Sequence, residues 1–318
     1  MALDALLQPV VLFFLLGALA AFARSDLAIP EAVAKGISLY LMMSIGLRGG
    51  GEVAESGFTH DMLLAGGAGL ALSFLLPLPA FWLLRTLGQL DRTNAAAVAA
   101  HYGSVSVVTF ATGSEILRQA GMAPAGFMVG VLAVMETPAI ISGLLLARAG
   151  GSNNLASRGG LLHETFLNGS VILLLGSFLI GMIDGKEGLK AVAPVFDVPF
   201  RGMLCIFLLD MGLIAARRLM DRRALSVRTV LLALALPVLN GTLGVCIGTA
   251  LGLDPGSAAA LGILAGSASY IAVPAVMRLA LPAADPGLYL GMSLAVTFPF
   301  NLTLGIAFYG WLAAHLVP

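Results

Sequence analysis

Gly103-Ser104-Val105-Ser106, a run of small residues inside a long apolar stretch, has a near copy later in the chain, Gly266-Ser267-Ala268-Ser269. Glycine and serine propagate an α-helix poorly. Backbone groups freed by a helix break are costly in lipid, so a break persists in a membrane only where it faces protein or a wet cavity. The two runs therefore predict two interrupted membrane-spanning helices, and this prediction decides the fold.

The composition indicates a membrane protein. Of the 318 residues, 59% are hydrophobic and 11% are charged, whereas soluble domains contain roughly 45–50% apolar and about 25% charged residues. A formal net charge of +0 and the lack of a long basic run argue against nucleic-acid binding. Cys205 and Cys246 form neither a CxxC pair nor a Cys/His cluster, so we expect no disulfide framework and no transition-metal site.

Apolar stretches of spanning length recur along the whole chain. A spanning helix needs about 20 mostly apolar residues. This criterion predicts an all-α polytopic membrane protein with ten transmembrane helices, at residues 8–24, 31–48, 61–85, 93–120, 124–148, 163–184, 196–216, 228–251, 256–281 and 286–313.

The ten predicted spans fall into two halves. Residues 1–148 form a first five-helix repeat, a polar cytoplasmic linker covers 149–162, and residues 163–318 form a second five-helix repeat. Because five is odd, a repeated half must be inverted in the membrane, and inverted repeats are typical of secondary transporters. We therefore expect the discontinuous fourth and ninth spans to meet at the bilayer midplane.

Lys and Arg residues set the predicted orientation, because they concentrate in cytoplasmic loops. With the N-terminus outside, 12 of the 17 basic residues face the cytoplasm and 5 face outside. Both termini are then expected outside, on the periplasmic side, in a multi-pass protein of the cell's inner (plasma) membrane. The outward-facing basic residues are Arg48, Arg118, Lys186, Lys190 and Arg201.

Each predicted break begins a new helix, whose N-terminus carries roughly half a positive charge and unpaired N–H donors. Two such ends form an anion cradle without any Lys or Arg, and serine hydroxyls suit a small oxyanion. The alternative is that the small residues only permit tight helix packing. The predicted substrate-binding residues are Gly103, Ser104, Val105, Ser106, Gly266, Ser267, Ala268 and Ser269.

Ionisable groups inside a span are costly and are functional candidates by default. Glu136 lies mid-span before Thr137 and Pro138, and its counterpart in the second half is Thr297. A carboxylate beside an anion site requires a cation between them, so we expect Na⁺ as the coupling ion, although a proton on Glu136 would serve almost as well. The alternative is a hydrogen-bonded packing role. The predicted sodium-binding residues are Glu136, Thr137, Thr297, Asn301 and Asp210.

Several stretches resemble the SbtA-type sodium-dependent bicarbonate transporter family. They are residues 35–50, 100–110, 135–141, 268–274 and 291–301, and the resemblance extends through nearly the whole chain. It implies two inverted five-helix repeats, a homotrimer, and Na⁺-coupled bicarbonate uptake by an elevator-like motion. Residues 103–106 and 268–269 would hold bicarbonate, and Glu136, Thr137, Thr297 and Asn301 would lie at or near sodium.

The resemblance also implies a small PII-like regulator that docks on the cytoplasmic face. The compact linker, which contains Gly151-Ser152-Asn153-Asn154, departs from the family pattern at this point and argues against such regulation. We expect a secondary active transporter, not an enzyme, that imports bicarbonate with Na⁺ by alternating access. The alternatives are a sodium-independent small-anion channel or uniporter, a symporter for another small monovalent anion, and a sensor that binds bicarbonate without moving it.

Overall fold

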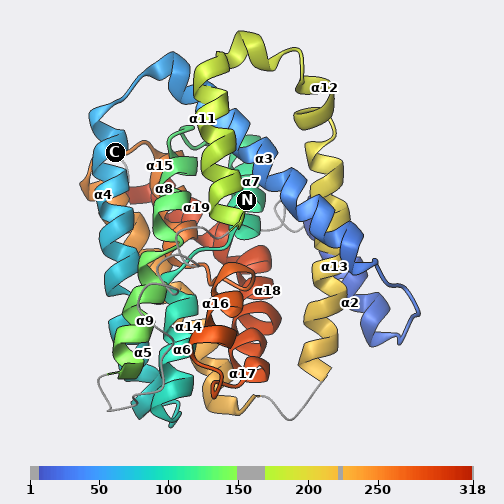
Figure 1. The fold of residues 1–318 in the computed structure, drawn as a ribbon, viewed down its shortest axis with the longest axis vertical. Helices are drawn as coiled ribbons and strands as arrows, with labels where there is room; N and C mark the ends of the chain where they lie inside the picture. Colours follow the sequence, from blue (N-terminus) through green and yellow to red (C-terminus); the bar gives the residue numbers. More distant parts are fainter. Residues whose placement is uncertain (1–6, 149–168, 221–224, 317–318) are drawn as a thin grey trace.

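The computed structural model describes residues 7–148, 169–220 and 225–316. The fold is 80% helical, and the described residues contain no strand. The predicted linker at 149–162 lies outside the described residues. Figure 1 shows a bundle in which the helices of the two halves are intermingled instead of forming separate bodies.

The helices of the first half follow the five predicted spans closely. They are α2 (Pro9–Phe22), α3 (Glu31–Ser56), α4 (His60–Leu75), α5 (Pro77–Thr86), α6 (Arg92–Gly103), α7 (Val107–Gln119), α8 (Met128–Met135) and α9 (Pro138–Arg148).

The second half begins with α11 (Gly169–Leu189) and ends in an irregular span. Its other helices are α12 (Ala193–Phe196), α13 (Phe200–Met220), α14 (Val227–Ala250), α15 (Pro255–Ala265), α16 (Ala272–Ala280), α17 (Pro286–Leu290), α18 (Phe298–Phe300) and α19 (Ile306–Leu316), with wide π-helical turns η1 (Gly291–Thr297) and η2 (Asn301–Gly305) on either side of α18.

Six helical stretches of the described residues are long and apolar enough to cross a membrane. They fall on the third, fourth, fifth, seventh, eighth and tenth predicted spans, and they are His60–Thr86, Arg92–Gln119, Met128–Arg148, Ala193–Met220, Val227–Ala250 and Pro286–Leu316. The first predicted span corresponds to the shorter apolar helix α2, and the ninth begins with the shorter apolar helix α15. The second lies within α3, and the described part of the sixth, residues 169–184, lies within α11. Six spans are therefore supported by length and composition.

The fourth, fifth and ninth predicted spans are interrupted. The fourth is broken between Gly103 and Val107, and the ninth between Ala265 and Ala272. The fifth is broken at Glu136–Thr137, between α8 and α9. In Figure 1, α7, α8 and α15 lie in the upper half of the bundle and α6, α9 and α16 in the lower half, so the breaks fall near mid-height.

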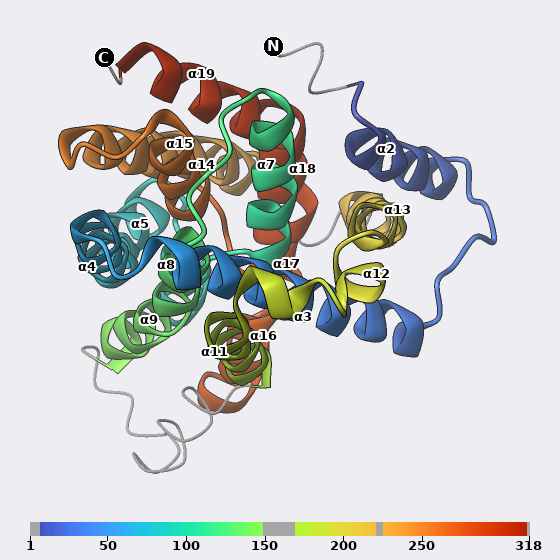
Figure 2. The same cartoon turned by 90° about the horizontal axis from the view of Figure 1, so that it is seen from above.

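Two pairs of long helices are related by the predicted repeat. Replacing each span of one pair by its counterpart in the other half gives the second pair. The first span packs on the seventh, α2 on α13, and the second packs on the sixth, α3 on α11. Glycines bring these backbones into contact, because a Cβ atom on Gly212 would collide with the Phe14 carbonyl and one on Gly50 with the Phe178 carbonyl. Viewed from above, α2 and α13 form one side of the molecule, while α4, α5, α14 and α15 form the other (Figure 2).

Large apolar side chains cover the outside of the bundle. Leu63 on α4 and Ile183 on α11 are 70% and 87% exposed, and Leu19 on α2 is also largely exposed. A soluble monomer rarely exposes so many large apolar side chains to water. These side chains instead fit a molecule whose perimeter is solvated by lipid.

Candidate functional site

The two predicted breaks meet in the structure. The backbone N–H of Ser269 donates to the carbonyl oxygen of His101 at 3.0 Å. The backbone N–H of Ser106 donates to the side-chain oxygen of Ser267 at 3.0 Å. Each interrupted span therefore satisfies backbone groups of the other, as a break inside a membrane requires.

Ser106 begins the upper half-helix of the fourth span. Its backbone is extended, and its hydroxyl oxygen accepts hydrogen bonds from the backbone N–H and the hydroxyl of Thr109, at 3.2 and 2.9 Å. This is the pattern of a serine N-cap, which satisfies one of the unpaired donors at a helix start. The remaining N–H groups of the first turn of α7 have no partner within their own helix.

A very small cavity of about 10 Å³, with room for roughly one water molecule, lies between the two breaks. Three of the eight predicted substrate-binding residues line it, namely Val105, Ser106 and Ser269. Five other residues outside the predicted cation site line the cavity. They lie in the stretches that resemble the family but were not predicted to bind substrate, and they are Met42, Val107, Tyr270, Ile271 and Ala272. The starts of α7 and α16 thus both face this cavity.

Three of the five remaining predicted substrate-binding residues make hydrogen bonds that hold the breaks in place. The Ser104 hydroxyl donates to the carbonyl oxygen of Glu136 at 2.9 Å. The Ser267 hydroxyl donates to the carbonyl oxygen of Leu264, and the Gly266 carbonyl accepts from the side chain of Asn301. Gly103 and Ala268 do not line the cavity.

Glu136 also lines the cavity, beside Ser106 and Ser269. It is 3% exposed, and its Oε2 atom is buried with no hydrogen-bond partner. A buried carboxylate without a partner is strongly disfavoured unless a proton or a cation neutralises it. The chemistry of this site is therefore that of a cation-binding or proton-binding carboxyl group next to two helix N-termini.

Ser73 on α4 repairs the helix break at Glu136. Its hydroxyl donates to the carbonyl oxygen of Met135 at 2.6 Å and accepts from the backbone N–H of Ala139 at 3.1 Å. One buried hydroxyl therefore replaces the hydrogen bond that these two backbone groups would make in a continuous helix. The sequence does not predict this role of Ser73, because its hydrogen-bond partners are more than 60 residues away along the chain.

Three other predicted sodium-binding residues lie away from the cavity. The Thr297 hydroxyl donates to the carbonyl oxygen of Ala233 and is hydrogen-bonded to the Tyr102 hydroxyl, both at 2.7 Å. Asn301 is held by the Gly266 carbonyl and by the Tyr309 hydroxyl. Asp210 is a buried residue of α13. Of the five predicted residues, only Glu136 lines the cavity, and Thr137 follows it directly.

Broken helices that meet around a buried site are typical of secondary transporters, a class of integral membrane proteins. The family is more specific. Residues 9–314 match the family model described as the Na⁺-dependent bicarbonate transporter superfamily, so the chain belongs to this superfamily, whose members are transporters and not enzymes. A search of curated proteins finds no match.

Proposed function

We propose that this chain is a Na⁺-coupled symporter that imports bicarbonate across the cell's inner (plasma) membrane by alternating access. One observation carries the proposal. The starts of two half-helices and a buried, unpartnered carboxylate surround the same cavity. Helix N-termini favour an anion, and a buried carboxylate favours a cation, so the groups that line the cavity suit an anion and a cation, and the cavity must widen to admit them.

The energetics of uptake favour joint movement. Moving a monovalent anion into a cell with a negative interior costs about 2.3 kcal/mol per 100 mV. One sodium ion that moves with the anion cancels this cost and adds the energy of its own gradient. In this proposal Val105, Ser106 and Ser269 contact bicarbonate, and Glu136 and Thr137 contact Na⁺. Thr297 and Asn301 support the breaks through their hydrogen bonds.

The repeat symmetry is also part of the proposal. The pairing of α2 with α13 and of α3 with α11 supports an inverted relation between residues 1–148 and 163–318. The pairing of α6 with α9 and of α15 with α19 supports it again. We include from the family resemblance a ten-span topology and a homotrimer. The short linker sequence at 149–162 argues against a PII-like cytoplasmic regulator.

Uptake into reconstituted vesicles tests the proposal. Labelled bicarbonate should accumulate with an inward Na⁺ gradient, and uptake should fall to the background of protein-free vesicles when K⁺ replaces Na⁺ at the same pH and membrane potential. Uptake that ignores Na⁺ would identify a channel or uniporter. Uptake of nitrate or acetate in place of bicarbonate would identify another substrate, and bicarbonate binding without uptake would identify a sensor.

A further inference from the structure

Two cavities lie one above the other between the same pair of helices, α3 and α7. The cavity between the breaks is lined by Met42 of α3 and Val107 of α7. A second cavity, nearer to the face where both helices end, is lined by Ile45 and Arg48 of α3 and by Phe110 and Ser114 of α7. Residues spaced by three or four positions share one helix face, so both cavities are walled by the same two faces.

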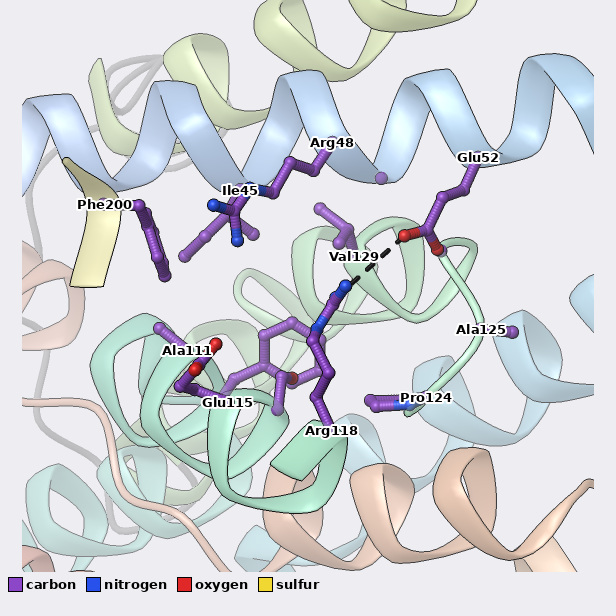
Figure 3. Close-up of a pocket in the computed structure, with 14 residues that line it drawn as sticks. Ile45, Arg48, Glu52, Ala111, Glu115, Arg118, Pro124, Ala125, Val129 and Phe200 are labelled. Atoms are coloured by element: carbon purple, nitrogen blue, oxygen red, sulfur yellow. Dashed lines mark ion pairs between the residues drawn. The ribbon is translucent and has the colours of Figure 1, made fainter. Parts of the chain in front are cut away.

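The outer cavity contains unused hydrogen-bonding groups. Arg48 Nε and Ser114 Oγ are both buried without a hydrogen-bond partner. The Arg48 guanidinium is held from its other side, by the backbone carbonyl of Asp197 at 2.9 Å and by the ring of Phe200 at 4.4 Å. In Figure 3, Arg48 and Arg118 point from α3 and α7 into the space between these helices. The Nε–H of this fixed guanidinium can therefore donate a hydrogen bond to a bound anion.

All five basic residues that the charge distribution assigns to the outside gather here. Arg48 and Arg118 line the outer cavity, Lys186 and Lys190 line the neighbouring cavity, and Arg201 pairs with Glu115 at 3.7 Å. Each of them has an acidic partner, and the longest of these ion pairs joins Arg118 to Glu52 at 4.0 Å. Arg118 therefore loses the weakest of these ion pairs when it binds an anion.

We propose that the space between α3 and α7 is the route by which the anion reaches the cavity between the breaks, and that Arg48, Ser114 and Arg118 bind a small planar oxyanion on this route. Guanidinium groups present paired donors that match the geometry of carboxylate-like anions, whereas chloride offers no such geometry. The route rests on the proposed function, because it assumes that the protein imports an anion. The binding site itself rests only on the contacts described above.

Opposite variants of one ion pair test the site. Arg118→Gln should raise the KM for bicarbonate uptake about tenfold, which is the effect of losing one charge-assisted hydrogen bond. Glu52→Gln should lower the KM, because it frees the Arg118 guanidinium. A purely structural ion pair would give changes in the same direction in both variants. Lys190→Gln is the matched control, since Lys190 lies on the same face and pairs only with the exposed Glu187.

Cysteine labelling gives a readout that does not depend on transport. Ala111 lines the outer cavity, and Ala111→Cys, with Cys205 and Cys246 replaced by serine, is treated with a negatively charged methanethiosulfonate. Bicarbonate should slow this reaction and chloride at equal ionic strength should not, and the protection should disappear when Arg118→Gln is added. Phe58→Cys, in the exposed turn before α4, should react at a rate that bicarbonate leaves unchanged.

The possible results separate this inference from the proposed function. Protection of Ala111→Cys without any vesicle uptake would support the oxyanion site and contradict the transport proposal. Na⁺-dependent uptake with an unchanged KM in both Arg118→Gln and Glu52→Gln would overturn the site and leave the transport proposal standing. An unreactive Ala111→Cys, equal protection by chloride, or the same KM change in Lys190→Gln would also overturn it.

Discussion

Ser106 serves the site through both its backbone and its side chain. Its N–H donates to Ser267 in the other half of the chain, and its hydroxyl caps α7. The backbone donor joins the two breaks. The two roles can be separated, because substitution by alanine keeps the N–H while substitution by proline removes it.

Ser106→Pro should therefore abolish bicarbonate uptake without preventing membrane insertion, and Ser269→Pro should do the same, since the Ser269 N–H donates to His101. Ser106→Ala keeps the N–H, so it should lower uptake less than Ser106→Pro does and should lose about 1 kcal/mol of stability with the cap. Vesicle uptake, normalised to the amount of inserted protein, measures both effects. Near-normal uptake by either proline variant would contradict the proposed anion cradle.

Glu136 gives a second prediction at the scale of one residue. Glu136→Gln removes the charge of the unpartnered carboxylate in the cavity, so the Na⁺ concentration needed for half-maximal uptake should rise sharply. The measurement is the Na⁺ dependence of uptake at saturating bicarbonate. Glu187→Gln, a change of the same kind at an exposed position on α11, should leave this dependence unaltered. An unaltered dependence in Glu136→Gln would remove this residue from the cation site.

The helices near the site are assembled from short pieces that other elements complete. Ser73 of α4 bridges the ends of α8 and α9, and Tyr309 of α19 contacts both Pro237 of α14 and Asn301 of η2. Such breaks in apolar surroundings are stable only while every freed backbone group has a partner. The stability of each interrupted element therefore depends on polar side chains of its neighbours.

Ser73→Ala should leave the Met135 carbonyl and the Ala139 N–H buried without their partner. The expected loss of stability is about 2 kcal/mol, the cost of an unsatisfied buried polar group. Ser293→Ala is the control, because the Ser293 hydroxyl is equally buried but bonds only the Tyr289 carbonyl four residues earlier in its own span. Thermal unfolding in detergent compares the two variants. An equal shift in both would show that the hydroxyl of Ser73 does not bridge the break.

The start of α6 gives a pH-dependent prediction. Burial raises the pKa of the Asp91 carboxyl, but hydrogen bonds from Asn94 and Thr93 outweigh burial and hold the pKa below its usual value of 3.8. A lowered pKa adds stability that is complete above the unfolded value and is lost as the pH falls through the folded value. Asp91→Ala should cost about 1 kcal/mol at neutral pH.

The difference in unfolding temperature between Asp91→Ala and the unaltered chain should shrink as the pH falls below 3.8. Asp61→Ala is the control, because Asp61 lies in the first turn of α4, whose cap is Thr59. A difference that stays constant down to pH 3 would contradict the capping role of Asp91.

How far the sequence predicts this structure depends on how far apart the hydrogen-bond partners lie along the chain. Local composition was sufficient for the breaks at 104–106 and 266–271, because each run combines glycine with two serines, which propagate a helix poorly, and the run recurs in the second half. The helix break at Glu136–Thr137 and its repair by Ser73 were not predicted, since the repair joins distant segments. The same reason applies to Thr297, whose hydroxyl donates to α14, and to Asn301, whose side-chain nitrogen donates to the ninth span, because both partners are distant in the sequence.

At the scale of the whole molecule, the distribution of charge predicts which face is outside. Phe58 precedes α4 and Leu87 follows α5, so they lie at opposite ends of the third predicted span, and both are exposed. In a background without Cys205 and Cys246, a membrane-impermeant maleimide added to intact cells should label Phe58→Cys and not Leu87→Cys. Permeabilised cells, in which both should react, provide the control. The reverse pattern would invert the predicted orientation.

The crossed hydrogen bonds from Ser106 to Ser267 and from Ser269 to His101 have a consequence for biosynthesis. When the first half leaves the ribosome, the partner of its broken span has not yet been made, and its bare amides would stand in hydrocarbon. We therefore expect the insertion machinery to keep the fourth span out of contact with lipid until the ninth span has been synthesised. Maturation is a late event that both halves complete together.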